Sequence, residues 1–250
     1  MSVADCIATG RYGLVFGASN IYGFGIDGNE RTLPSLLAAR FGLPFGNVCL
    51  PEANSRNLFS ILSDILTRAS AVPSAVLLFT GTDFSSFCYT GMADAVFGSP
   101  NLRQLKKVLE ERGGRLEPER DFKQLVDFTT LWTTAAVDLC RRHGIPLVIG
   151  AATSFFDRPN LSEVERDCKL GEATGPGQQR YFATYNSFVS DFRSARLELV
   201  ERLGVPLAGP GPGSDLGFID EFHYNEAGTK ALSEHLSGTL EGVLGELAAQ

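Results

Sequence analysis

Residues 14–23 have the sequence LVFGASNIYG, and this stretch decides the fold class. Its first three residues are apolar, and the next three, Gly17, Ala18 and Ser19, are small. A short apolar run that ends at glycine is typical of a strand buried in a parallel sheet. We therefore expect a strand to end at Gly17 and a helix to begin near Ser19.

Similar apolar runs recur along the chain and alternate with longer segments of helical periodicity. The predicted strands lie at residues 14–16, 46–50, 75–80, 146–150 and 205–208. The predicted helices lie at residues 33–41, 57–69, 122–143, 178–203 and 226–249. Three of these helices are followed by a glycine, which favours a left-handed C-cap, at Gly42, Gly144 and Gly204. The predicted fold class is α/β: a flavodoxin-like three-layer sandwich with a mostly parallel five-stranded sheet and helices on both faces.

The length of 250 residues favours a single domain, residues 1–250, whose core needs no disulfide or metal. Two stretches do not fit the alternation and are predicted insertions, at about 84–121 and 157–177. Both leave the sheet at the carboxyl ends of strands, where ligands bind in open α/β sheets. They are candidate lids over a binding site, and solvated surface loops are an equal alternative.

The composition argues against several classes of protein. A net charge of −7 leaves no basic stripe for phosphates, so we expect no nucleic-acid partner. The longest apolar stretches, such as 75–79 and 145–152, are far shorter than the roughly 20 residues of a membrane helix, so we expect no membrane span. Residues 1–10 contain no basic segment followed by a long apolar one, which predicts no secretory signal and a cytoplasmic location.

Metal and cofactor sites are not predicted either. The five cysteines form no CxxC pair, and the three histidines are dispersed, so we expect reduced thiols and no metal. Residues 23–28, GFGIDG, match the GxGxxG pattern of dinucleotide-binding turns. These glycines begin well after the strand, with Ser19 in between, whereas the phosphate-binding turn follows its strand directly. No nucleotide cofactor is therefore expected.

The residues that can carry chemistry lie near the two ends of the chain. Ser19 follows the first strand, where its own backbone N–H is free to face an anion. Asp220 stands three residues before His223, directly ahead of the last predicted helix. An aspartate at that spacing can turn its carboxylate toward Nδ1 and leave Nε2 to accept a proton from a hydroxyl. Both segments are predicted to leave strands at the same edge of the sheet.

Taken singly, a Gly-Ala-Ser turn is usually only a tight connection, and a DxxH segment is usually an N-cap beside a surface histidine. Taken together and in this order, the segments FGASNIYG (16–23) and FIDEFHYNEAGTKALSEHL (218–236) resemble the nucleophile block and the DxxH block of the SGNH or GDSL hydrolase superfamily. The resemblance extends over essentially the whole chain. It implies that Ser19 is the nucleophile, His223 the general base and acid, and Asp220 the residue that orients His223.

Two other blocks depart from that superfamily and concern its oxyanion hole. In the second block, Glu52 occupies the position of the glycine whose N–H completes the hole in that superfamily. Ala53 and Asn54 follow it. In the third block, Thr82 is followed by Asp83, which stands where an asparagine amide is expected. An ionised Asp83 has no proton to donate, and the loss of one donor costs about 10² to 10³ in rate. These five residues are the candidate oxyanion or substrate-binding residues.

Other roles for these substitutions remain open. A hydroxyl or amide of Asn54, Thr82 or Ser55 could donate in place of the missing amide. Alternatively, Asp83 and Glu52 bind a cationic group or assist an amine or hydroxyl acceptor.

The sequence thus predicts a serine-dependent acyl hydrolase, an esterase or thioesterase. We expect it to act on a small-molecule acyl substrate through an acyl-serine intermediate. One alternative is an acyltransferase on the same scaffold that uses an alcohol or amine acceptor. The other is a catalytically degenerate binding module. The sequence does not distinguish the oligomeric state.

Overall fold

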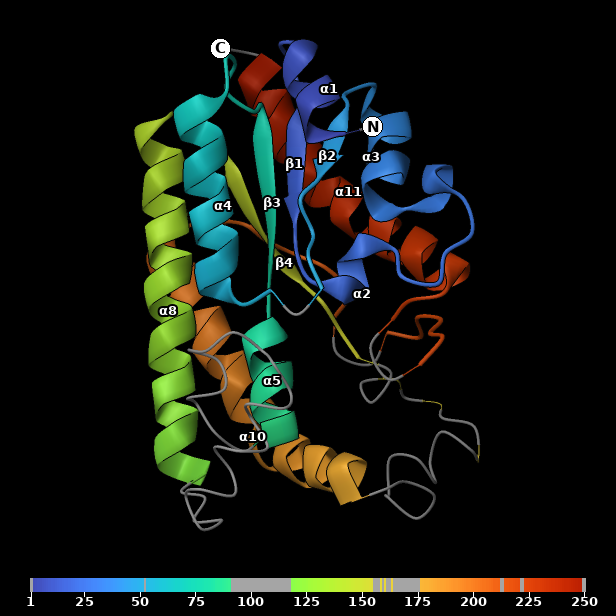
Figure 1. The fold of residues 1–250 in the computed structure, drawn as a ribbon, viewed down its shortest axis with the longest axis vertical. Coiled ribbons are helices and arrows are strands. Elements are labelled where there is room, and N and C mark those ends of the chain that lie inside the picture. The colour runs from blue at the N-terminus through green and yellow to red at the C-terminus, as the bar shows by residue number, and fades with distance from the viewer. Residues whose placement is uncertain are drawn as a thin grey trace.

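A computed structural model of the chain describes residues 2–51, 53–90, 118–154, 158, 160, 163, 176–211, 214–220 and 223–248. Its strands are β1 (Gly13–Phe16), β2 (Phe45–Asn47), β3 (Ala75–Thr80), β4 (Leu147–Ala151) and β5 (Leu207–Ala208). They form one sheet in the order β2-β1-β3-β4-β5, and every neighbouring pair is parallel (Figure 1). The predicted α/β fold class is confirmed.

The longer helices of the described residues match the predicted ones. These helices are α3 (Leu33–Phe41), α4 (Ser55–Arg68), α8 (Pro118–Arg142), α10 (Pro176–Leu203) and α11 (Glu226–Ala248). Strand and helix ends differ from the predicted ones by four residues or fewer. The backbone at the glycines after α3, α8 and α10 has positive φ, as the C-cap prediction required, at Gly42, Gly144 and Gly204. Among the described helices, none combines the length and hydropathy that a bilayer crossing needs.

Within the described ranges, two further helices and the short 3-10 turn η1 (Asn29–Arg31) were not predicted. Helix α1 (Val3–Ala8) begins at a capping box in which Ser2 and Asp5 exchange hydrogen bonds. Helix α5 (Thr82–Thr90) follows β3 directly and occupies the start of the predicted insertion 84–121. The other end of that insertion is the first turn of α8. The central part of that insertion, residues 91–117, and most of the predicted insertion 157–177 lie outside the described residues.

The side chains of each strand alternate between two cores. In β1, Leu14 and Phe16 pack in the core under α4, α8 and α10, whereas Val15 packs in the core under α3 and α11. Figure 1 shows α4 and α8 on one side of the sheet and α3 and α11 on the other. Because most strand residues are buried on both faces, the strands are mostly apolar, which is the signal that identified them in the sequence.

A third, aromatic core lies beyond the carboxyl end of β3, between α5, α8 and α10. Phe84 of α5 stacks on Phe192 of α10, with ring centroids 4.6 Å apart. Phe122 of α8 stacks in the same way on Phe188, at 4.7 Å. This core holds α5 against α8 and α10. Figure 1 shows that α5 follows directly after the end of β3.

Candidate active site

Ser19 lies at the turn between β1 and the short helix α2 (Ser19–Tyr22). A glycine is needed at position 17 because a Cβ there would lie 2.8 Å from the Cβ of Ile21, a buried residue of α2. Ser19 is half-buried, and neither its backbone N–H nor its hydroxyl donates to another described residue. Both groups are therefore available to a ligand at the edge of the sheet.

The loop that carries His223 is held in place by its own backbone. Phe218 and Tyr224 form an antiparallel bridge, and the N–H of Ile219 donates to the carbonyl of His223 at 2.8 Å. The Tyr224 hydroxyl donates to the carbonyl of Thr153 and accepts from its N–H, both at 2.9 Å. Thr153 follows β4, so these bonds attach the loop to the carboxyl edge of the sheet.

Two glycines allow this loop to enter α11. A Cβ at Gly228 would collide with the carbonyl of Gly217, and a Cβ at Gly217 would collide with the side chain of Asn225. The side-chain amide oxygen of Asn225 accepts from the N–H of Gly228 at 2.9 Å and caps the helix. The glycine that follows the DxxH block is therefore required by close backbone packing.

Asp220 holds the imidazole of His223 through several contacts. Nδ1 lies 2.7 Å from Oδ2 and 2.9 Å from Oδ1, and the His223 backbone N–H donates to Oδ1 at 2.9 Å. Because a carboxylate only accepts hydrogen bonds, this geometry places the proton on Nδ1. Nε2 is then an acceptor, and it is buried without a hydrogen-bond partner among the described residues.

The structure brings the segment that begins at Ser19 against the His223 loop. The ring of Phe24, which follows α2, packs on the imidazole of His223 with centroids 4.7 Å apart. Ile21 of α2 and Tyr224 of the loop share one core. The contact between the Ser19 hydroxyl and Nε2 is not present as a hydrogen bond in this structure. Asp220 and His223 are thus paired, and Ser19 lies on the neighbouring segment.

Asp83 does not face a substrate, which corrects the expectation that it stands in the oxyanion hole. Its side chain is fully buried. One oxygen accepts from the N–H of Ser55 at 3.0 Å, and the other accepts from the hydroxyls of Ser55 and of Thr129, the latter at 3.0 Å. Asp83 therefore joins the first turns of α4 and α5 to the middle of α8.

Burial raises the pKa of the Asp83 carboxyl above its ordinary value. The hydrogen bonds from Ser55 and Thr129 act in the opposite direction, because they favour the charged form, and they are the smaller effect. The pKa of this carboxyl is therefore raised by burial although three hydrogen bonds oppose the shift.

The second block also has its polar groups occupied. The N–H of Ala53 donates to the carbonyl of Leu50 at 3.2 Å, so it is not aimed at a ligand. The Asn54 side chain is the N-cap of α4: its oxygen accepts from the N–H of Asn57 at 2.9 Å. Glu52, the third candidate in this block, lies outside the described residues.

Thr82 is the third-block residue that keeps a side chain at the edge. It is half-buried, begins α5, and its hydroxyl has no hydrogen bond to the rest of the described chain. The carboxyl end of β3 lies beside that of β1, since Phe16 pairs with Leu78. Among the described residues, Thr82 and the N–H of Ser19 are thus candidate donors without a hydrogen-bond acceptor.

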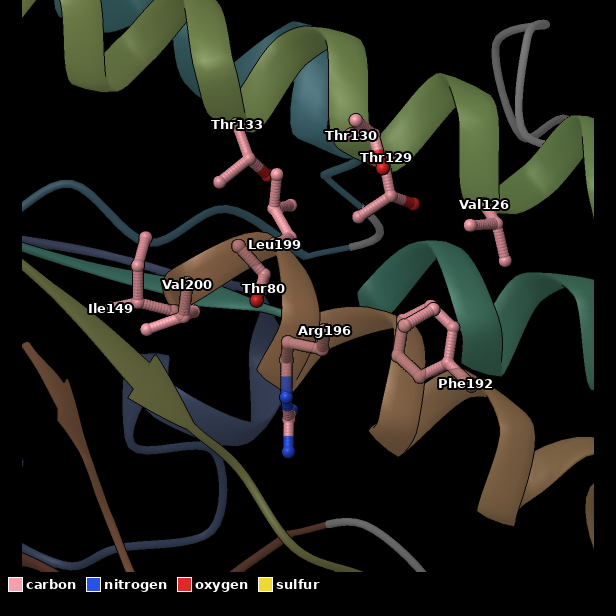
Figure 2. Close-up of a pocket in the computed structure, with 11 residues that line it drawn as sticks. Thr80, Val126, Thr129, Thr130, Thr133, Ile149, Phe192, Arg196, Leu199 and Val200 are labelled. Atoms are coloured by element: carbon pink, nitrogen blue, oxygen red, sulfur yellow. The ribbon is translucent and has the colours of Figure 1, made fainter. Parts of the chain in front are cut away.

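A narrow cavity lies between α8 and α10, against Thr80 at the end of β3 (Figure 2). Three threonines of α8 line it, and Figure 2 shows them opposite Arg196 and Leu199 of α10. The Thr133 hydroxyl is buried and has no hydrogen-bond partner among the described residues, and the space holds little more than a water molecule. In the part of the chain that the structure describes, no three His, Cys, Asp or Glu side chains gather as a metal site would need.

Solved structures with this architecture are numerous. A carbohydrate acetylesterase family member from Sinorhizobium meliloti superposes with a TM-score of 0.54 at 14% identity, covering 94% of this chain and 99% of that chain. A GDSL-like lipase from Bacteroides thetaiotaomicron gives 0.55 at 11% identity, with 94% and 90% covered. The chain has the GDSL-type hydrolase fold.

A psychrotrophic esterase from Pseudoalteromonas also has this GDSL-type fold, with a TM-score of 0.52, 15% identity and coverage of 94% of this chain and 98% of that chain. At these identities the similarity concerns the fold. No protein-family model matches the sequence, and no curated protein matches it at a significant level.

Within the GDSL-type fold, three residues of this site escaped the sequence analysis. Tyr224 and Thr153 fix the His223 loop, and Phe24 covers the imidazole. Tyr224 had a usable signal, since a tyrosine beside the DxxH histidine is amphipathic and seeks a partner for its hydroxyl when buried. Phe24 had none, because its contact joins residues about 200 positions apart.

Proposed function

We propose that this chain is a serine-dependent acyl hydrolase that cleaves a small-acyl ester or thioester. The observation that carries the proposal is the imidazole of His223: Asp220 occupies Nδ1, while Nε2 has no partner among the described residues. This is the arrangement of a general base. It lies on a loop packed against the segment that presents Ser19. The names of the structural relatives, an acetylesterase, a lipase and an esterase, agree with this chemistry.

In the first half of the reaction, Ser19 Oγ bonds to the acyl carbon as its proton moves to Nε2. The bond from that carbon to the alcohol oxygen then breaks, and Nε2 returns the proton to that oxygen. The N–H of Ser19 and the hydroxyl of Thr82 stabilise the negative oxygen that forms in between. Water repeats the sequence to release the acid. The step needs Oγ within about 2.6–3.2 Å of Nε2, a contact that in many enzymes tightens only in the substrate complex.

The main argument for the acyltransferase alternative no longer holds. It rested on an Asp83 that faces an acceptor, and Asp83 is instead buried on Ser55 and Thr129. Hydrolysis is therefore the activity we propose.

The test combines a fluorophosphonate probe with hydrolysis of p-nitrophenyl acetate and butyrate by wild type, Ser19→Ala and His223→Ala. We expect labelling at Ser19 and turnover that both variants reduce by about 10⁴-fold or more. Ser60→Ala, a serine of α4 whose hydroxyl donates to the carbonyl of Arg56, is the matched control and keeps full activity. Folded wild-type protein that neither binds the probe nor cleaves either ester would refute the proposal in favour of a binding module. Labelling with turnover only after an amine or alcohol is added would favour acyl transfer.

A further inference from the structure

We propose that Phe24 and Ile219 form the contact surface for the alcohol part of the ester, and that the substrates are esters of apolar alcohols. The inference rests on the proposed function and adds the substrate class. It starts from the side of His223 on which the two residues lie.

The chemistry of the reaction determines which part of an ester lies beside the imidazole. In the step that breaks the ester, Nε2 returns its proton to the oxygen of the departing alcohol. The alcohol therefore lies against the histidine, while the acyl carbonyl oxygen lies at the oxyanion donors, the N–H of Ser19 and Thr82. Side chains that pack on the imidazole consequently contact the alcohol part rather than the acyl part.

The side chain that packs on the imidazole in this structure is aromatic. The Phe24 ring lies 4.7 Å from the imidazole, centroid to centroid, with the planes inclined by 40°. Phe24 is nevertheless 58% exposed, so most of its ring surface is open to a ligand. The imidazole side chain itself is only 18% exposed. A molecule that approaches His223 from this direction meets the phenyl ring.

Ile219 extends this surface. Its side chain is 50% exposed, although it belongs to the rigid His223 loop. A Cβ at Gly25 would lie 2.6 Å from Ile219 Cδ1, so the isoleucine rests directly on the backbone beside Phe24. The backbone at Gly25 has φ +74°, a conformation that favours glycine. The absence of a side chain at position 25 thus brings the two apolar groups together.

Most large apolar side chains of the described residues are buried, and Phe24 and Ile219 are two exposed ones that both lie beside His223. Contiguous exposed apolar surface at a site commonly marks the place where a ligand buries it. Burial of a benzyl or butyl group against Phe24 and Ile219 would stabilise the bound ester, whereas a methyl group is too small to cover both side chains.

The experiment varies the alcohol and the acyl group separately. Butyrate esters of methanol, n-butanol and benzyl alcohol form one series, and p-nitrophenyl acetate, butyrate and hexanoate form the other. We expect wild-type kcat/KM to rise from the methyl to the benzyl ester. In Phe24→Ala the benzyl-to-methyl ratio of kcat/KM should fall about tenfold, while the hexanoate-to-acetate ratio stays within about twofold. Ile219→Ala should lower the same ratio, and Phe24→Leu should give an intermediate value.

Leu131→Ala is the matched control, because Leu131 is an apolar residue of α8 with a similar exposure, 59%. It should leave both ratios unchanged. An unchanged benzyl-to-methyl ratio in Phe24→Ala, or a change in the acyl-chain ratio instead, would overturn this inference while Ser19-dependent turnover still supports the hydrolase. Absence of any Ser19-dependent turnover in wild type would overturn the proposed function and this inference with it.

Discussion

At the scale of single residues, the proposed general base, His223, contacts Asp220 through Nδ1 and Phe24 through its ring. One carboxylate fixes the ring and its tautomer, and one phenyl ring covers a face. The DxxH spacing predicts the first contact because Asp220 and His223 are close in sequence. The second contact joins Phe24 to a residue far along the chain and depends on how two loops pack. Sequence spacing therefore predicts the Asp220–His223 pair better than it predicts the residues that pack around this pair.

Asp220→Asn should lower kcat/KM for a p-nitrophenyl ester by about 10³ to 10⁴-fold, because the amide no longer enforces the Nδ1–H tautomer. The free energy of unfolding should change little, since the Asp220 side chain is 37% exposed. The control is Asp215→Asn. Asp215 lies shortly before Asp220 in the chain, and its carboxylate accepts a hydrogen bond from Arg158. Activity of Asp220→Asn within tenfold of wild type would contradict the role given to this carboxylate.

At the scale of elements, single side chains join the loops and helices around the candidate site. Tyr224 attaches the His223 loop to β4, and Asp83 attaches α4 and α5 to α8. Helix α5 itself, TDFSSFCYT, is rich in serine, threonine and aromatic residues, which are weak helix formers. It is helical because Phe84 and Phe87 bury in the aromatic core, so its sequence alone did not predict it.

The position of Asp83 could not be predicted for a related reason. Its partners, Ser55 and Thr129, lie 28 and 46 residues away. The sequence alone does not distinguish a buried aspartate from an exposed one. The motif of the SGNH or GDSL superfamily suggested that Asp83 faces the substrate.

Tyr224→Phe should lower both stability and activity. It leaves the N–H and carbonyl of Thr153 without the hydroxyl, which costs about 1–3 kcal/mol, and it frees the His223 loop, which should lower kcat/KM. Tyr12→Phe is the matched control, because its hydroxyl donates to the carbonyl of Ala71 at 2.7 Å. The control should lose comparable stability in urea unfolding and keep its kcat/KM. Equal activity in the two variants would show that the Tyr224 bond serves folding alone.

Asp83→Asn tests the buried carboxyl through pH. A pKa raised in the folded state means that Asp83 contributes stability at pH values below its unfolded pKa. That contribution is lost as the pH rises through the folded pKa. The free energy of unfolding of wild type minus that of Asp83→Asn should therefore fall as pH rises above about 4, in urea titrations from about pH 4 to 8. Ester turnover should not rise in this variant, because the side chain does not face the site.

The matching control for that titration is Asp64→Asn, an exposed carboxylate of α4 paired with Arg68, whose difference from wild type should be small at every pH. A difference for Asp83→Asn that grows with pH would mean that the three hydrogen bonds outweigh burial.

At the scale of the whole molecule, the alternation of apolar strands and amphipathic helices in the sequence predicted a parallel five-stranded sheet. All five strands were identifiable because each is buried on both faces. The edge beside which Ser19 and the His223 loop lie followed from the parallel arrangement, which places every carboxyl end on one side. The insertions could not be interpreted in the same way, since no periodicity relates them to the sheet.

The burial of four cysteines outside the strands makes a prediction about thiols. Cys6, Cys49, Cys88 and Cys140 are free and buried, and burial raises the pKa of the Cys140 thiol to about 12. Thiolates are the reactive form, so these four should react with Ellman's reagent only on the timescale of unfolding. Native protein should show at most one fast thiol, Cys168, and denatured protein should show all five. Rapid reaction of two or more thiols in native protein would mean that a core opens readily.

The attachment of the His223 loop to β4 by Tyr224 has a consequence for biosynthesis. The ribosome synthesises Ser19 directly after β1, and it synthesises Tyr224 only after all five described strands. The proposed nucleophile is therefore made well before the proposed base. Under the proposed function, a nascent chain that stops before residue 217 lacks ester hydrolysis even where its sheet has formed.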